Sequence, residues 1–304
     1  MSEPSRVEAL RKTLPKVNPK YLIMGLITTI LVVGEWRYSI LGGYDRLVTA
    51  LAVCLVAEAV LSKVVHGTVL SRLGSAYISG ISIALLLKPP PGLLWPFVLV
   101  AFITIVSKYV LTYRGRHLWN PSNFGIGLLL LLTPGSVAIL SIQWGNELGT
   151  NLVIWALGIL IAFRARVLHV TAAYVLAYIV FAALRHLMVG GPFAAEVAPL
   201  TGPMYQLFIF FMITDPRTTV STTRGRILVA VLVALVEMGI RLAGDFQISW
   251  VSPLFPSPPI LALFIVGPIA MFLDLWLKDR RKVAKDAPTQ EPSIPRERVS
   301  QPSV

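Results

Sequence analysis

The stretch GPMYQLFIFFMITDPRT, residues 202–218, is the most informative part of this chain. It is an apolar run that stops at Thr214-Asp215-Pro216, well short of the roughly 20 apolar residues that a helix needs to cross a bilayer. A segment of this kind in a membrane chain predicts a helix that ends inside the protein rather than at the far surface.

A second segment has the same design. Residues 74–91, GSAYISGISIALLLKPPP, begin with Gly-x-x-Tyr, as residues 202–205 do, and the two starting glycines lie 128 residues apart. The prolines that end the two runs, Pro89 and Pro216, lie 127 residues apart. Paired short segments bounded by Gly and Pro are typical of broken helices around a buried site.

The composition is that of a polytopic membrane protein. The 304 residues are 55% hydrophobic and 14% charged, with a mean hydropathy of +0.73, well beyond what a soluble domain uses. We expect an all-α protein with about ten transmembrane helices, at 21–35, 47–64, 74–87, 93–111, 122–140, 151–164, 169–187, 202–214, 226–243 and 258–277.

The placement of lysine and arginine gives a topology. With ten crossings, 22 of the 27 basic residues fall on the side of the N-terminus and five on the other. The positive-inside rule then places both termini in the cytoplasm, in a multi-pass protein of the inner (plasma) membrane. The net charge of +12 needs no nucleic-acid partner, because this bias and attraction to anionic membrane lipids explain it.

The chain divides into three parts. Residues 1–19 form a polar, basic cytoplasmic arm, residues 20–277 the membrane domain, and residues 278–304 a disordered cytoplasmic tail. The domain consists of two repeats, about 20–140 and 151–277. Each has five crossings, and because five is odd the second repeat is inverted. Their third and eighth helices are the broken ones, and such folds place a site where broken helix ends meet.

Two motifs lie near the expected helix ends. In the loop TYRGRHLWNPSNFG, residues 112–125, Asn120 and Pro121 suit the cap and first turn of the next helix. Alternatively this loop folds against the broken helix and helps to hold a polar ligand, with Arg114, Arg116 and His117 facing a phosphate or a partner. Asp215 is either part of a surface turn or a buried carboxylate that shapes a cofactor or ion site.

Two glutamates lie deep inside predicted helices. Glu58 and Glu237 are candidates for an ion or proton relay, because carboxylates within a membrane are costly. The alternative is that they serve as hydrogen-bond anchors between helices. The single cysteine, Cys54, cannot hold a metal cluster by itself, and we expect no metal site.

The order of these motifs resembles the NqrB/RnfD family of membrane electron-transport subunits over roughly residues 70–277, and similar short chains occur in enediyne-type biosynthetic clusters. The resemblance rests on GSAYISGISIALLLKPPP, Lys108, GRHLWNPSNFG and FFMITDPRTT with the following RGR. It implies a ten-helix inverted repeat related to urea transporters. It also implies a flavin-carrying membrane subunit of a redox-driven ion pump, which works with other membrane redox subunits.

Carried over by position, the resemblance implies a set of residues around the flavin and quinone: Gly74, Ser79, Gly80, Asn120, Pro121, Thr214, Asp215 and Thr218. The family attaches FMN to the threonine of an Asp-x-x-Ser-Gly-Ala-Thr motif in the outer loop. Here that loop is SIQWGNELGTN, residues 141–151, and lacks the motif. Covalent FMN is therefore not expected, and Thr150 is the threonine that would carry it.

The leading functional prediction is an integral-membrane subunit of an electron-transport or ion-translocating complex, with non-covalent FMN or riboflavin, with a quinone, or with no cofactor. At most it is a non-autonomous part of a redox-driven translocase. Two alternatives use the same fold. One is a transporter or channel for a small polar solute, and the other is a redox-silent membrane scaffold.

Overall fold

The computed structural model describes residues 19–133, 138–139 and 147–286. Each of the ten predicted apolar segments contains a helix. In chain order these are α2 (Pro19–Tyr38), α3 (Tyr44–His66), α4 (Leu70–Leu86), α5 (Trp95–Val110), α6 (Pro121–Leu132), α7 (Leu148–Arg164), α8 (Leu168–Val189), α10 (Pro203–Leu207) with the π-helix η2 (Phe208–Met212), α11 (Thr223–Asp245) and α12 (Pro258–Asp286).

Short elements connect these helices. The helix α9 (Phe193–Val197) and the 3-10 helix η1 (Ala198–Thr201) precede α10, and the 3-10 helix η3 (Ser249–Leu254) precedes α12. Strands β2 (Thr112–Tyr113) and β3 (Arg116–His117) form a hairpin between α5 and α6. Strand β1 (Leu87–Lys88) pairs antiparallel with β4 (Ala138–Ile139).

The architecture is that of an all-α membrane protein. Within the part of the chain that the structure describes, four helices are long and apolar enough to cross a membrane: α3, α8, α11 and residues Pro258–Arg280 of α12. Shorter apolar helices lie within α4, α5, α6 and α7. Large side chains such as Trp36, Val64 and Leu187 are exposed on the outer helix faces, as expected where lipid replaces water.

The eighth apolar segment is interrupted, as its sequence predicts. It passes from η1 through α10 into η2, so no part of it is a long regular α-helix. Its residues Phe208, Ile209 and Phe210 are nevertheless almost fully buried. The interruption is therefore enclosed by protein, which is the condition for irregular backbone at membrane depth.

The third segment differs from the expectation of a broken helix. Residues Leu70–Leu86 form one continuous α-helix of 17 residues, which is short but not interrupted. It ends in the two-residue strand β1, just before Pro89. Proline disfavours the α conformation in the residue that precedes it, which explains the position of the stop.

The fifth helix is shorter than the predicted span of 122–140. It ends at Leu132, and Thr133 already has non-helical dihedral angles. The next residue is Pro134, so the same steric rule ends this helix too. Ala138 and Ile139 then lie in a strand instead of a helix.

The C-terminal boundary is also corrected. The helix α12 continues to Asp286, whereas the sequence analysis begins a disordered tail at residue 278. Residues 278–286, KDRRKVAKD, are rich in lysine and arginine, which favour helix once it has started. A Lys278–Asp274 ion pair one turn apart supports the continuation. The arm up to residue 18 and the tail from residue 287 lie outside the described residues.

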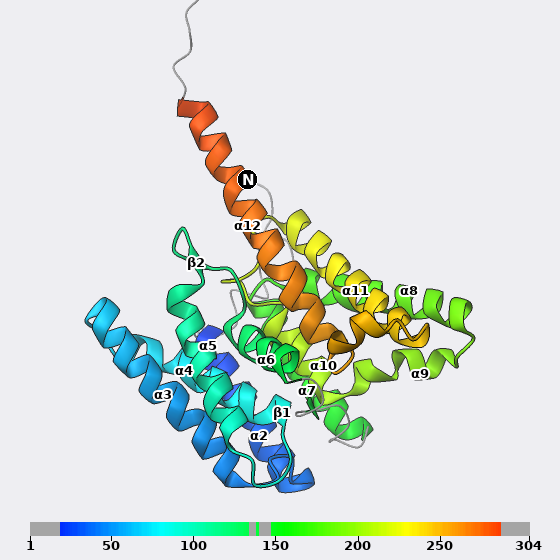
Figure 1. Ribbon diagram of the computed structural model, residues 1–304, viewed down its shortest axis with the longest axis horizontal. Coiled ribbons are helices and arrows are strands. Elements are labelled where there is room, and N and C mark those ends of the chain that lie inside the picture. Colours follow the sequence, from blue (N-terminus) through cyan, green and yellow to red (C-terminus); the bar gives the residue numbers. More distant parts are fainter. Residues whose placement is uncertain (1–18, 134–137, 140–146, 287–304) are drawn as a thin grey trace, which may run out of the picture.

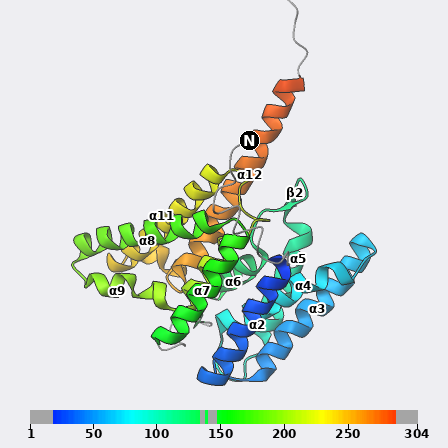
Figure 2. The same ribbon diagram turned by 180° about the vertical axis from the view of Figure 1, so that it is seen from behind.

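The helices of the two halves gather on opposite sides of the molecule (Figure 1). Helices α3, α4 and α5 form one side and α8, α9 and α11 the other, and the view from behind agrees (Figure 2). Helices α6, α10 and α12 lie between them, and the end of α12 projects beyond the bundle. The short helices α6 and α10 thus lie in the middle, beside the long helix α12.

Helix packing explains Gly80, which the sequence analysis assigns to the flavin region. A Cβ atom at this position would lie 2.8 Å from Leu51 Cδ2 and 3.1 Å from Leu51 Cα in α3. The backbone of α4 therefore approaches α3 more closely than any side chain would permit. Small residues at helix contacts are a standard device of membrane bundles.

We expect Gly80→Val to destabilise the protein by about 1–3 kcal/mol, the usual range for overpacking a close contact. Thermal unfolding in detergent, followed by size-exclusion chromatography, measures the change. The control is Gly239→Ala in α11, because a Cβ there meets nothing within 4 Å. A Gly80→Val variant as stable as the control would refute the packing role.

Candidate functional site

The candidate site is the place where the β2–β3 hairpin meets the turn after η2. We call it the basic junction and define it as residues 112–120 and 214–219. The hairpin turns at Arg114 and Gly115, which both have positive φ, 54° and 74°, as a two-residue hairpin turn requires. Asn120 then caps α6 by accepting a hydrogen bond from the Asn123 amide at 3.1 Å, and Pro121 occupies the first turn. The predicted capping role is confirmed.

The Asp215 carboxylate holds the two parts of the basic junction together. It accepts hydrogen bonds from Asn120 Nδ2 and Thr218 Oγ1, each at 3.2 Å. It also accepts one from the backbone N–H of Arg217 at 3.0 Å. The sequence analysis places Asp215 in a surface turn or in a buried site, and the structure puts it at the joint between two loops. The 112–125 loop does fold against the broken helix.

A second set of hydrogen bonds also runs from the hairpin to the turn. Arg116 Nη2 donates to the carbonyl oxygens of Pro216 at 2.9 Å and Thr219 at 3.1 Å. These carbonyls follow the interrupted helix, where a regular helix would have supplied donors. The guanidinium thus satisfies main-chain acceptors beyond the end of a broken helix.

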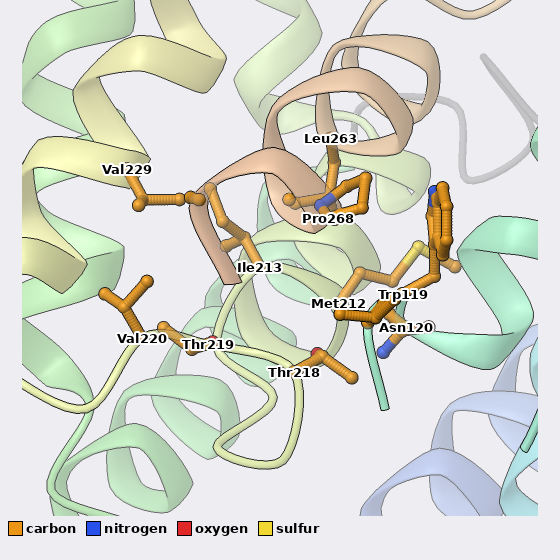
Figure 3. A pocket seen from close by; sticks show the side chains of 13 residues that line it. Trp119, Asn120, Met212, Ile213, Thr218, Thr219, Val220, Val229, Leu263 and Pro268 are labelled. Atoms are coloured by element: carbon orange, nitrogen blue, oxygen red, sulfur yellow. The ribbon is translucent and has the colours of Figure 1, made fainter. Parts of the chain in front are cut away.

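A small cavity lies beside Asn120 and Thr218 (Figure 3). Its volume is about 20 Å³, and Met212, Ile213 and Pro268 contribute apolar walls. That volume holds about one water molecule. The immediate surroundings of Asn120 and Thr218 are therefore too tight for a flavin or quinone ring.

A much larger cavity, of about 750 Å³, borders the basic junction. It lies within the usual range of small-molecule sites, about 300–1,000 Å³. We call it the basic cavity. Its lining comes from α3, α4, α5, the hairpin and the turn after η2: Glu58, Val65, His66, Arg72, Ser75, Lys108, Tyr109, Thr112, Gly115, Arg116, His117, Pro216 and Arg217.

The inner end of the basic cavity is a buried ion pair. Lys108 Nζ lies 3.1 Å from Glu58 Oε2, with the side chains only 7% and 1% exposed. Tyr109 donates a hydrogen bond to the other carboxylate oxygen at 2.8 Å, and Lys108 also donates to Ser75 Oγ at 3.1 Å. Glu58 therefore joins α3 to α5, and through Lys108 to α4.

His117 lies in the wall of the basic cavity. Burial lowers its pKa below the ordinary histidine value, and the nearby cations Arg217, Lys108 and Arg72 act in the same direction against Asp215. Its Nδ1 atom is buried and has no hydrogen-bond partner among the described residues. The ring is thus neutral near pH 7 and leaves one polar atom unsatisfied.

The second buried carboxylate, Glu237, occupies a different environment. It accepts hydrogen bonds from the hydroxyls of Tyr174 in α8 and Tyr205 in α10, and pairs with Arg241 at 3.0 Å. The adjacent cavity has a volume of only about 10 Å³. The contacts of Glu237 match the expected anchor between helices, and the expected ion or proton relay through either glutamate stays a prediction.

The other predicted site residues lie apart from the basic cavity. Ser79 bonds to the carbonyl of Ser75 within its own helix, and buried Thr214 does the same to Phe210. Gly74 lies in α4 beside Ser75, which does line the cavity. Thr150 lies in the first turn of α7, and its side chain is outside the described part of the chain.

The lining residues that sequence reasoning does not single out include Arg72, Ser75 and Tyr109. A signal for the buried end of the cavity does exist. Glu58 and Lys108 are opposite charges inside apolar segments, and such charges pair when they can. Nothing in the sequence indicates that Arg72 and Tyr109 face the same space, because they come from different helices.

A scan against models of protein families finds no match for this chain, and a search of curated proteins finds none either. The family resemblance described above therefore stays an expectation.

We expect Asp215→Ala to loosen the basic junction by about 1–3 kcal/mol, because hydrogen bonds to a charged acceptor are lost and their donors are left without it. Hydrogen exchange should rise in residues 112–120 and 214–219 and stay the same in α8. Thr218→Ser, which keeps the hydroxyl, serves as control. Unchanged exchange in the Asp215→Ala protein would show that the carboxylate does not hold the junction.

The lowered pKa of His117 gives a pH dependence with a definite sign. The folded protein binds this proton less tightly than the unfolded chain. The contribution of the neutral ring to stability is therefore present above the unfolded pKa of about 6.5, and it is lost as pH falls toward the lower folded pKa. Thermal unfolding between about pH 7.5 and 5.5 should show a shallower loss for His117→Gln than for the wild type. Equal slopes would contradict this assignment.

Proposed function

We propose that this chain is an integral-membrane subunit of an electron-transport or ion-translocating complex, which holds a flavin or quinone non-covalently in the basic cavity. The proposal includes ten crossings arranged as two inverted five-helix halves, with both termini in the cytoplasm. It also includes other membrane redox subunits as partners, because the sequence contains no nucleotide-binding glycine loop and cannot bind an iron–sulfur cluster with one cysteine.

One observation carries the proposal. Two of the motifs that carry the family resemblance, the Asn-Pro loop and the Thr-Asp-Pro turn, are joined by the Asn120–Asp215 hydrogen bond across 95 residues of sequence. The cavity beside them has about 750 Å³ of space, enough for a ring system of three fused rings. Motifs that meet at a cavity are better explained by a ligand than by packing alone.

The lining of the basic cavity fits such a ligand. The rings of His66 and Tyr109 lie 5.9 Å apart at the wall and offer a partly apolar surface to a flat ring. Arg72, Arg116 and Arg217 favour a ligand that carries or gains negative charge. A bound flavin or quinone would supply reversible electron transfer there, and the residues of the chain would position it and stabilise the added charge.

A transporter for a small anionic solute is the second candidate. The observation in its favour is the Glu58–Lys108 pair, which closes the inner end of an otherwise accessible cationic cavity. A gate of this kind opens if the pair separates. This function requires solute flux into liposomes by this chain alone, without any redox partner.

The test is purification of the full chain in a mild detergent with its native lipids, followed by absorbance and fluorescence spectra and by extraction of flavins and quinones. We expect one flavin or quinone per chain, released without proteolysis because it is not covalent. A pure preparation of the full chain that contains neither a flavin nor a quinone would refute the redox function. Flux of an anion in liposomes from the same preparation would then support the transporter.

A further inference from the structure

The helix α12 contains a proline, Pro268, in its interior. Proline has no N–H, so the carbonyl oxygen of Phe264, four residues earlier, receives no hydrogen bond from within the helix. The indole of Trp119, in the loop before α6, supplies one, because its Nε1 atom donates to the Phe264 oxygen at 2.9 Å. A side chain from the first half of the chain thus replaces the main-chain bond that proline removes from a helix of the second half.

The part of α12 before Pro268 is fixed to α6. Asn123 Nδ2 in α6 donates a hydrogen bond to the carbonyl oxygen of Ile260 at 2.8 Å. A Cβ atom at Gly127 would lie only 2.7 Å from the ring of Phe264, so the two helices are in close contact there. This part of α12 therefore moves only together with α6.

The part of α12 after the proline is less enclosed. Of residues 271–280, only Met271 and Leu275 are buried. The loop before α11 is attached to this part, because the N–H and the hydroxyl of Ser221 each donate to the Asp274 carboxylate at 3.2 Å. Few buried contacts thus oppose a movement of this part of the helix.

The β2–β3 hairpin is also attached to α12 after the proline. The rings of Tyr113 and Phe272 lie 5.5 Å apart, and Arg114 forms an ion pair with Asp279 at 3.0 Å. Trp119, in the same loop, contacts α12 before the proline. The loop between α5 and α6 therefore bridges the two parts of α12.

A small void lies beside the proline. The cavity of about 20 Å³ that borders Trp119 and Asn120 is also lined by Gly267 and Pro268 (Figure 3). Helices kink at proline, and protein interiors are otherwise close-packed. The void is therefore at the place where the angle between the two parts of α12 can change with the least overlap of atoms.

We propose that Pro268 is a hinge in α12, that the Trp119 indole latches it, and that the hinge controls access to the basic cavity. When the indole leaves the Phe264 carbonyl, the outer part of α12 bends and moves the attached hairpin. The hairpin supplies part of the cavity wall: Thr112, Gly115, Arg116 and His117. The control of ligand access rests on the proposed function, whereas the hinge itself requires no particular ligand.

The hydrogen bonds of Arg116 hold the closed state. Its guanidinium donates to the carbonyl oxygens of Pro216 and Thr219 across the basic junction. A hairpin that moves with α12 exchanges these bonds for bonds to water in the opened cavity, and such an exchange costs little net free energy. The structure therefore represents the latched state, in which both the indole and the guanidinium bonds are made.

The latch is tested by a double-mutant cycle on the thermal unfolding of the full chain in detergent. Trp119→Phe keeps an aromatic ring but removes the N–H donor, and it should lower the unfolding midpoint by about 2 °C. Pro268→Ala restores a main-chain donor, so in that background Trp119→Phe should have less than about half of this effect. Trp155→Phe in α7 is the control and should have the same effect in both backgrounds. Equal effects of Trp119→Phe in both backgrounds overturn the latch.

Access to the basic cavity is tested by cysteine labelling of the full chain in nanodiscs. A charged methanethiosulfonate reagent reacts with Ser75→Cys, which lines the cavity from α4, while the native Cys54 is buried. We expect Trp119→Phe to raise the labelling rate at least about threefold. Tyr113→Ala, which detaches the hairpin from α12, should abolish this increase. Arg224→Cys, exposed and outside the cavity, should react at the same rate in every background.

The outcomes separate the hinge from the proposed function, because neither measurement needs a ligand. An unchanged labelling rate of Ser75→Cys in the Trp119→Phe protein overturns the control of access, even if the protein contains a flavin or quinone. A raised rate that depends on Tyr113 supports the hinge, even in a protein that purifies without either cofactor, which refutes only the redox function.

Discussion

The Asp215 carboxylate is the interaction on which the centre of this structure depends. An interrupted helix leaves main-chain groups without partners inside the helix, and here other protein groups satisfy them. Asp215 accepts hydrogen bonds from Asn120, Thr218 and the Arg217 amide, while Arg116 donates to carbonyls of the same turn. The bonds from Asn120 and Arg116 fix a hairpin from the first half of the chain against a turn from the second. The wall of the basic cavity includes parts of both, so the cavity exists only while this junction holds.

Electrostatics explains how charge is distributed in the basic cavity. Glu58 and Lys108 are nearly fully buried, and such a pair is tolerated because each partner also finds further hydrogen bonds, from Tyr109 and to Ser75. Neutralised in this way, the inner end of the cavity contributes little net charge. The positive potential therefore arises from the arginines nearer the opening, where partial exposure lowers the cost of leaving a guanidinium without a carboxylate.

The two buried glutamates show that the same type of residue can occupy two different environments. Glu58 and Glu237 each lie in a long apolar helix and each accept a hydrogen bond from at least one tyrosine hydroxyl and a cation. Glu58 borders a cavity of about 750 Å³, whereas the space beside Glu237 is about 10 Å³. Tyr174, Tyr205 and Arg241 fill the surroundings of Glu237 and join three helices. Both residues are glutamates, and the side chains of the neighbouring helices decide whether a ligand has room beside them.

The sequence by itself determined the class of the protein, the positions of its apolar helices, the interruption after residue 202 and the Asn120 cap, because these features follow from local composition, from hydropathy and from the steric effects of proline. The predicted end of α6 was wrong because the effect of Pro134 on the preceding residue was overlooked. The predicted end of α12 was wrong because the helix continues into a charged segment. Only the tertiary structure decided that Gly80 serves helix packing and that Arg72, Tyr109, Arg116 and Arg217 line one cavity. Those residues belong to segments far apart in the chain, and no periodicity within a segment specifies which face of one helix meets which loop. That choice depends on the packing of the whole bundle, where shape and charge are satisfied together.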